Sequence, residues 1–288
     1  MSLGDAQRAD SGMVKLGRAY PALCLHAPDE AGAPSDACPC SAQIPVEHVL
    51  EVRTRGCSFI RITCTPVRLV ELVVGRLFTE GMISSVDDIV SVDISEDLSV
   101  VDVVFASEEL PMRSRRGEVD VVVTYGDIGR PVSEGERGAG IAEARSRTEA
   151  PWSVDEVFSL ARIFAQDTPI HTATYGAHSC YMAVAGELKY CCEDLGRHNA
   201  LDKVIGSALL AGDDLSRALV FSSGRIPADM IGKVIRAGVP VLVTKAVPTD
   251  LAVRMAREAG LVLICSARPD SIKVFNDPTL LGFEGALP

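Results

Sequence analysis

Alternating and helical patterns of hydrophobic residues cover most of the chain after residue 44 and predict two groups of elements. In the first group, two alternating runs flank Arg55-Gly56, a dipeptide typical of a hairpin turn. A helical repeat begins after Pro66 and ends before Gly81, which favours a left-handed cap. Strands are expected at residues 49–54, 58–63, 89–94, 100–105 and 119–125. This group predicts a smaller α+β subdomain over residues 44–125.

The second group, over residues 151–288, ends in a regular alternation of strands and helices, which predicts a parallel sheet with right-handed crossovers. Ligands of such sheets gather beyond the carboxyl ends of the strands. The expected elements are a helix from Ser153 to Ala165, a hairpin over residues 181–192 that turns at Gly186-Glu187, strands at residues 218–221, 239–244 and 261–265, and helices that begin at Pro227 and Thr249.

Two segments show no steady period. Residues 1–43 are rich in Gly, Ala, Asp, Ser and Pro, a composition typical of a mobile tail. Residues 126–150 are rich in Gly, Arg and Glu and are expected to form a long mobile loop or linker.

Composition narrows the functional classes. The chain has 288 residues, 47% of them hydrophobic, which is enough for a sizeable core. Its net charge of −11 argues against nonspecific binding of nucleic acid, although it leaves room for a local basic site. No apolar run reaches the roughly 18 residues of a membrane-spanning helix, and the first residues lack the apolar region of a secretory signal. We therefore expect a cytoplasmic protein that binds neither nucleic acid nor membrane.

The nine cysteines are an odd number, and none lies in a C-x-x-C pair. In a reducing compartment this favours thiols over a disulfide framework. Cys38 and Cys40 lie in the expected tail, where they are either incidental or able to capture a metal or sulfur. No zinc-finger spacing occurs, so no structural metal is expected.

The chain is organised around residues 193–203, which read EDLGRHNALDK. A helical repeat of hydrophobic residues begins within this stretch. Asn199 is expected to cap that helix, with Asp202 three residues later as in a capping box. Arg197 and His198 then lie just before the helix, where backbone N–H groups and a guanidinium suit a phosphate or another anion. For any one of these residues, a solvated helix cap is the alternative.

Three more cationic residues, Arg225, Lys245 and Arg268, each follow a predicted parallel strand. The carboxyl ends of parallel strands meet at one edge of a sheet, so these side chains are expected on a common rim. Each alone is more often a solvated charge. Their shared position favours a site for an anionic ligand.

Five segments of the chain resemble the FdhD family of formate dehydrogenase accessory proteins, which are sulfurtransferases that mature molybdenum cofactor. EDLGRHNALDK is the most specific of them. In TYGAH, Tyr175 replaces a glycine of the family's T-G-G-x-H, and in SSGRIPADM, Pro227 and Asp229 depart from S-G-R-x-S-x-E-[ML]. The segments are LVVGRLFTEGMI at residues 72–83, TYGAH at 174–178, EDLGRHNALDK at 193–203, SSGRIPADM at 222–230 and VPTDLAV at 247–253.

The resemblance implies an α/β fold whose C-terminal part is similar to cytidine deaminase, without its zinc ligands. It also implies a homodimer that binds bis-molybdopterin guanine dinucleotide, takes sulfur from a cysteine desulfurase and serves a formate dehydrogenase-like client. A guanine nucleotide should then act as a ligand analogue. No catalytic residue is assigned. The cofactor-binding candidates are His178, Arg197, His198, Asn199, Asp202, Lys203, Ser223, Gly224, Arg225, Lys245, Cys265, Ser266, Ala267, Arg268, Pro269 and Asp270.

One departure from the family bears on function. The family carries sulfur as a persulfide on a C-G-x-C-G loop, and the corresponding residues 126–150 contain no cysteine here. Because a thiolate is needed to accept and pass sulfur, either another cysteine does so, or this protein carries cofactor without sulfur transfer. Cys180, Cys191, Cys192 and Cys265 lie next to the proposed site. Cys192 is nearest to Arg197 and His198, a setting that favours a lowered pKa. For each of the four, a small buried strand residue is the favoured alternative.

A metal-dependent hydrolase of the deaminase type is a third hypothesis, with His171, His178, Cys180 and His198 as its polar groups. Zinc deaminases need H-x-E together with P-C-x-x-C. Neither string occurs in the chain, which argues against this class.

Overall fold

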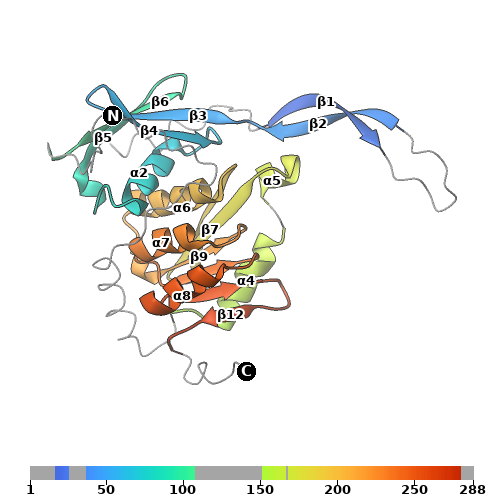
Figure 1. Cartoon of the computed structure of the whole chain (residues 1–288), viewed down its shortest axis with the longest axis vertical. Helices are drawn as coiled ribbons and strands as arrows, with labels where there is room; N and C mark the ends of the chain where they lie inside the picture. Colours follow the sequence, from blue (N-terminus) through green and yellow to red (C-terminus); the bar gives the residue numbers. More distant parts are fainter. Residues whose placement is uncertain (1–16, 26–36, 108–150, 167, 280–288) are drawn as a thin grey trace.

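The computed structural model describes residues 17–25, 37–107, 151–166 and 168–279, which form three β-sheets with helices layered between two of them (Figure 1). A four-stranded sheet in the order β4-β3-β6-β5 packs against one helix, and these elements lie where the sequence predicted them between residues 49 and 105. Arg55 and Gly56 have φ of 50° and 74°, which confirms the tight turn between the first two strands. The elements are β3 (His48–Thr54), β4 (Cys57–Cys64), α2 (Leu69–Thr79), the 3₁₀ helix η2 (Val86–Asp88), β5 (Ile89–Ile94) and β6 (Val100–Phe105). The strand expected at residues 119–125 and the segment 126–150 lie outside the described residues.

The larger sheet has six strands in the order β12-β11-β10-β9-β7-β8. The three strands β9, β10 and β11 are parallel, which confirms the alternation read from the sequence. The flanking strands are antiparallel, and the last was not predicted. The strands are β7 (His178–Val184), β8 (Glu187–Asp194), β9 (Ala218–Ser222), β10 (Val241–Thr244), β11 (Val262–Cys265) and β12 (Lys273–Asn276).

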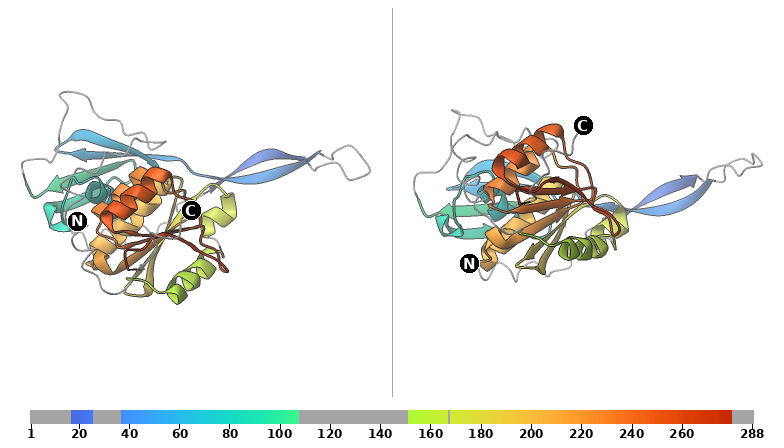
Figure 2. Two further views of the ribbon diagram at one scale, coloured as in Figure 1. Left: turned by 60° about the horizontal axis from the view of Figure 1, so that its bottom comes forward. Right: turned by 90° about the horizontal axis from the view of Figure 1, so that it is seen from below.

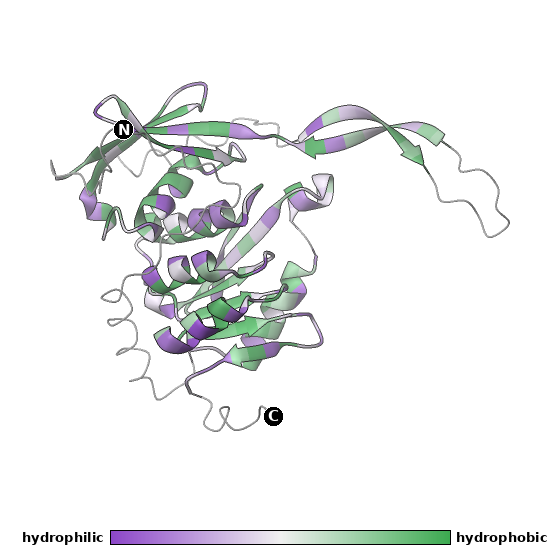
Figure 3. Ribbon diagram, viewed as in Figure 1, coloured by the Kyte–Doolittle hydropathy of each residue, from purple (hydrophilic) through white to green (hydrophobic). Residues whose placement is uncertain are grey.

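Helices cover both faces of this sheet (Figure 2). Val220 points to the face covered by α6, α7 and α8, whereas its neighbour Phe221 points to the face covered by α4. In Figure 3 the hydrophobic colour accordingly gathers on the sheet and on the inner sides of these helices. The helices are α4 (Val154–Phe164), α5 (Pro169–Thr174), α6 (Arg197–Ala211), the 3₁₀ helix η3 (Leu215–Arg217), α7 (Ala228–Arg236) and α8 (Asp250–Ala259).

Helix caps explain where most of these elements begin. The hydroxyls of Ser153 and Thr249 accept hydrogen bonds from the backbones of Glu156 and Ala252, which confirms both as N-caps. The expectation that Asn199 caps α6 is wrong. The cap residue is Gly196, because Asn199 turns inward and is fully buried.

The two halves meet where α2 crosses α6, at Gly75 and Gly206. A Cβ atom built on Gly75 would lie 1.9 Å from the carbonyl oxygen of Asp202, and one on Gly206 would lie 1.9 Å from that of Glu71. Such separations are impossible for real atoms, so both positions require glycine. The backbones of the two helices are therefore in direct contact, and this contact fixes the small sheet against the large one.

Two strands lie within residues 1–43 and just beyond, where the sequence predicted no regular element. β1 (Gly17–Leu25) and β2 (Ala37–Pro45) pair in antiparallel register as a two-stranded ribbon. The ribbon extends away from the body in all views, and its base lies beside α5 (Figures 1 and 2). Because most of its residues are exposed on both faces, it lacks the alternation by which strands are recognised.

No helix within the described ranges is both long and apolar enough to cross a membrane.

Candidate functional site

The rim predicted from the parallel strands is formed by the loops after β9, β10 and β11, with the start of β7 beside them. The backbone N–H of Lys245 donates to Ser222 O over 3.2 Å, which joins the first two loops. Ala267 N donates to Thr244 O over 3.0 Å, and Thr244 Oγ1 donates to Gly224 O over 2.7 Å. These bonds hold the loops in fixed positions relative to one another, so the rim is a single rigid edge.

Arg197 lies at the centre of this rim, in the first turn of α6. A Cβ on Gly224 would lie 2.9 Å from Cβ and 3.0 Å from Cδ of Arg197, so the guanidinium stem packs directly over this glycine. Arg197 Nε is buried and has no hydrogen-bond partner within the described part of the chain. Since buried donors are nearly always paired, this atom is a candidate donor to a ligand at the rim.

The N-terminus of α6 adds to the same site. Its N-cap residue, Gly196, has no side chain, and no side-chain hydrogen bond caps the helix. Backbone N–H groups and the helix dipole there favour a negatively charged group. An anion beside Arg197 would therefore meet both a guanidinium and a helix N-terminus.

Two histidines flank Arg197. His198 Nε2 lies 2.8 Å from Asp229 Oδ2 at the start of α7. Burial raises the pKa of Asp229, but the hydrogen bond and charge of His198, together with smaller contributions from the backbone of Met230 and the charge of Arg197, leave this pKa below its usual value. His178 Nδ1 lies 3.2 Å from Ser223 Oγ. Burial, followed by the charge of Arg197, lowers the pKa of His178, which favours its neutral form.

The remaining cations, Arg225, Lys245 and Arg268, lie in the loops after the three parallel strands. Arg225 and Arg268 are exposed, and the guanidinium of Arg268 donates to the backbone oxygen of Lys245. The ammonium of Lys245 lies 5.5 Å from the ring centre of Phe164, in a cation–π contact. Within the loop after β11, Cys265 and Ala267 are buried, Ser266 is intermediate with φ of 51°, and Arg268, Pro269 and Asp270 are exposed.

Three predicted site residues do not reach the rim: Asn199, Asp202 and Lys203 are all fully buried. Lys203 Nζ lies 2.6 Å from Asp194 Oδ2, and both side chains are 0% exposed. Asn199 donates to the same carboxylate over 2.8 Å. The expectation that Lys203 holds a phosphate is therefore wrong for this structure, because its charge is neutralised inside the protein.

Asp202 belongs to a second buried cluster between α2, α6 and α7. Its carboxylate lies 2.9 Å from Lys233 Nζ and accepts a hydrogen bond from Thr79 Oγ1 over 2.7 Å. Arg76 Nη1 lies 3.6 Å away. These partners come from distant parts of the sequence, which is why the local pattern suggested a capping box instead.

The four cysteines next to the rim are poorly suited to nucleophilic chemistry. Burial raises the pKa of Cys180 well above its ordinary value, that of Cys192 to about 11 and that of Cys265 to about 12. The expectation of a lowered pKa at Cys192 is wrong, because burial outweighs the nearby cations. Cys191 is exposed, yet its pKa is also raised by partial burial.

Sequence reasoning missed the role of Glu193, whose carboxylate caps α5. It accepts hydrogen bonds from the backbones of Ile170 over 3.0 Å and His171 over 2.8 Å, and one from the hydroxyl of Thr168. Only its position at the head of the polar stretch hinted at a special role. Glu193 thus fixes α5 beside the start of β7.

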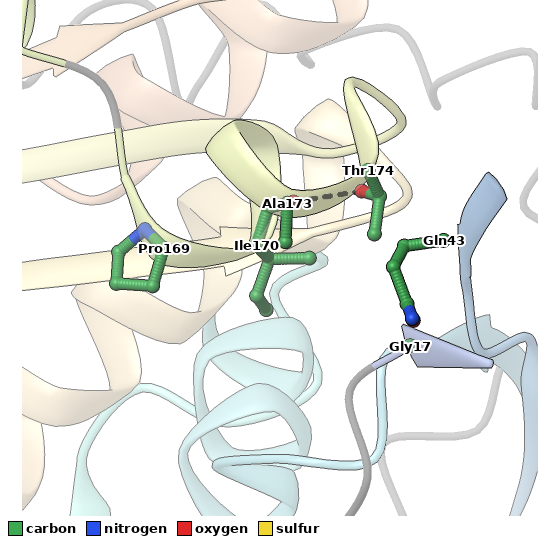
Figure 4. A pocket seen from close by; sticks show the side chains of 6 residues that line it. All are labelled: Gly17, Gln43, Pro169, Ile170, Ala173 and Thr174. Carbon is green, nitrogen blue, oxygen red and sulfur yellow. Dashed lines mark hydrogen bonds between the residues drawn. The ribbon is translucent and has the colours of Figure 1, made fainter. Parts of the chain in front are cut away.

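A small apolar pocket of about 230 Å³ lies between α5 and the base of the ribbon (Figure 4). Its lining contributes almost no polar surface, and none of the predicted site residues takes part. It is therefore separate from the rim. The lining residues are Gly17, Gln43, Pro169, Ile170, Ala173 and Thr174.

The groups required for a hydrolase are not assembled. His171 Nδ1 lies 2.9 Å from Ala177 O, and His198 is paired with Asp229. Among the residues that the structure describes, no three His, Cys, Asp or Glu side chains are grouped as metal ligands.

These features define a mixed α/β protein whose parallel strands end at a rim that carries several cationic side chains. The model of the FdhD/NarQ family matches residues 45–281, and the chain belongs to this family. It is 35% identical to the sulfur carrier protein FdhD of Sulfurisphaera tokodaii over 235 residues, covering 80% of this chain and 88% of the relative. The homologue from Methanothermobacter thermautotrophicus is 31% identical, covering 81% and 90%.

The fold has a solved counterpart. The crystal structure of a candidate formate dehydrogenase accessory protein from Desulfotalea psychrophila matches with a TM-score of 0.69. The match covers 91% of this chain and 98% of that protein at 23% identity, so it speaks for the fold alone.

Proposed function

We propose that this chain is an accessory protein for the maturation of a formate dehydrogenase-like enzyme, and that its rim binds bis-molybdopterin guanine dinucleotide. Membership of a family of sulfur carriers supports the first part. The buried, unpartnered Nε of Arg197, held over Gly224 at the N-terminus of α6, carries the second. We infer that the protein acts as a homodimer of chains with an N-terminal part over residues 44–125 and a deaminase-like part over residues 151–288.

The residues of the rim suit this ligand. Arg197, Arg225 and Arg268 provide positive charge for phosphates, as does the open N-terminus of α6. Neutral His178 and the hydroxyl of Ser223 offer hydrogen bonds to the polar edges of a base or a pterin. When bound, the cofactor supplies the molybdenum that takes up sulfur, whereas the protein binds, orients and shields it.

Binding of guanosine diphosphate, measured by calorimetry, tests the rim. Arg197→Ala and Arg225→Ala should each weaken it by about tenfold or more, because each removes a charge-assisted contact. Arg257→Ala is the matched control, since this arginine is in the last turn of α8, at the opposite edge of the sheet. Unchanged affinity in both rim variants would refute the assignment.

A cofactor carrier without sulfur transfer is the alternative. It is favoured by the absence of cysteine from residues 126–150 and by the burial of three of the four cysteines beside the rim. The two functions differ in one observable. A sulfur carrier acquires sulfur on one of its own cysteines from a cysteine desulfurase, whereas a pure cofactor carrier binds the nucleotide and stays unmodified.

A further inference from the structure

Three cysteines gather on one face of the ribbon. Cys24 and Cys38 are directly opposite each other in the antiparallel register, and Cys40 is opposite Ala22. Positions two apart on a strand face the same way, so all three thiols share a face. Cys38 and Cys40 are exposed and Cys24 is half-buried.

The facing pair has the spacing of a reactive dithiol. Residues directly opposite in an antiparallel pair have Cα atoms about 4.5–5.5 Å apart, which falls within the range that a disulfide spans. Cys24 and Cys38 can therefore react with each other without movement of the backbone. Cys40 faces no second thiol across the ribbon.

The chain contains a second pair of facing cysteines with which the Cys24–Cys38 pair can be compared. Cys180 and Cys192 are opposite each other in β7 and β8, with the same antiparallel pairing, but they are 0% and 2% exposed. A donor protein has no access to them. The ribbon pair differs from the buried pair mainly in accessibility, and the ribbon extends well away from the body (Figure 1).

We propose that Cys24, Cys38 and Cys40 form the sulfur-accepting site of this chain, with Cys40 holding sulfur and the facing pair releasing it. This inference rests on the proposed role as a sulfur carrier, and it assigns the cysteines that the role requires. From Gly17 to Cys24 the strand spans about 24 Å. The thiols are thus placed to enter the active site of a sulfur donor.

The chemistry balances without an outside oxidant. The thiolate of Cys40 attacks the outer sulfur of a persulfide on a cysteine desulfurase; an S–S bond forms, the donor's S–S bond breaks, and the donor leaves as a thiolate. In the same way, transfer of sulfur from the desulfurase to the thiolate of Cys38 gives a persulfide on Cys38, which faces Cys24. Attack of the Cys24 thiolate on the inner sulfur of Cys38 then forms the Cys24–Cys38 disulfide and expels hydrosulfide. The expelled sulfur gains two electrons, one from each thiol sulfur, and a cellular dithiol restores the pair.

The test is peptide mapping by mass spectrometry under nonreducing conditions, after incubation of the full chain with a cysteine desulfurase and cysteine. In the unaltered protein, one added sulfur atom is expected on Cys40, together with a Cys24–Cys38 disulfide. Cys24→Ser should abolish the disulfide and raise the persulfide on Cys38 to the occupancy of Cys40. Cys40→Ser should remove the stable persulfide and leave the disulfide.

Cys57→Ser is the matched control, because Cys57 is exposed but lies on β4, away from the ribbon. It should leave the ribbon labelling unchanged. Sulfur on Cys57 or Cys191 at the level of Cys40 would overturn the proposal, since labelling would then follow exposure alone. Absence of sulfur from the ribbon, with the desulfurase itself shown to be loaded, would overturn it as well.

Guanosine diphosphate binding separates this inference from the proposed function. The ribbon variants should bind the nucleotide like the unaltered protein, because the thiols lie outside the rim. Sulfur on the ribbon without nucleotide binding would refute the cofactor assignment and leave the acceptor site intact. Nucleotide binding with an unlabelled ribbon would refute the acceptor site and leave the cofactor assignment intact.

Discussion

Two parts of one polar stretch, EDLGRHNALDK at residues 193–203, have opposite environments. In the first turn of α6, Arg197 and His198 lie at the open rim, and Arg197 retains an unpartnered buried donor. One turn further on, Asp202 and Lys203 are fully buried and paired with residues of other elements. At the rim the Arg197 Nε has no partner within the described part of the chain, whereas Asp202 and Lys203 form ion pairs inside the protein.

The difference shows that closeness in sequence does not imply a shared role. Successive residues of an α-helix are rotated by about 100° about the helix axis. The charged side chains of this stretch therefore point to different sides of α6. Those in the first turn extend past the sheet edge, and those further along face α2 and the large sheet. Loss of a rim residue should therefore affect binding, and loss of an interior residue should affect stability.

The largest effect is expected from Lys203→Met, which leaves the Asp194 carboxylate buried without its cation. Breaking a buried pair in this way costs about 3–5 kcal/mol of unfolding free energy, and denaturant titration measures the loss. Lys189→Met is the matched control, because the Lys189–Asp213 pair lies near the surface and should change stability by less than about 1 kcal/mol. Equal losses in the two variants would contradict the distinction between interior and surface pairs.

A somewhat smaller effect is expected from Gly75→Ala or Gly206→Ala, because each added methyl overlaps the backbone of the other helix. The expected loss of stability is about 1–3 kcal/mol, typical of overpacking. In Gly196→Ala, the nearest atoms to the new Cβ would be side-chain atoms, Asn199 Nδ2 at 3.2 Å and Asp194 Oδ1 at 3.8 Å, so this control should lose less. A tolerated alanine at both crossing positions would contradict the direct helix contact.

The smallest effect concerns the rim and depends on pH. Because the pKa of His178 is lowered in the folded state, the unfolded chain binds a proton first as the pH falls below 6.5. The free energy of unfolding should therefore decrease as the pH falls from 6.5 to the folded pKa. His178→Gln should make this decrease shallower, as measured by denaturant titration at several pH values. An unchanged slope would mean that His178 titrates alike in both states.

Much of the fold could be predicted because its signals are local. The caps at Ser153 and Thr249, the turn at Arg55-Gly56 and the three parallel strands are each encoded within a few residues. The ribbon could not be predicted, since its strands bury neither face consistently.

The site was predicted in part for the same reason. Arg197 and Arg225 follow from their positions at strand and helix ends, which is a local property. The burial of Lys203 does not, because its hydrogen-bond partner Thr65 lies 138 positions away. From the sequence alone, Asp229 was only a departure from the family motif. Its hydrogen bond with His198 becomes apparent only in the folded structure.

The crossing at Gly75 and Gly206 has a consequence for how this protein can change over evolutionary time. A side chain gained at either position requires the opposite helix to move away. Substitutions in one half are therefore constrained by the other half. Hybrid genes that join the N-terminal half of one relative to the C-terminal half of another should yield folded proteins only when both parents retain this close approach. Because of these two glycines, the two halves of the protein are expected to evolve together.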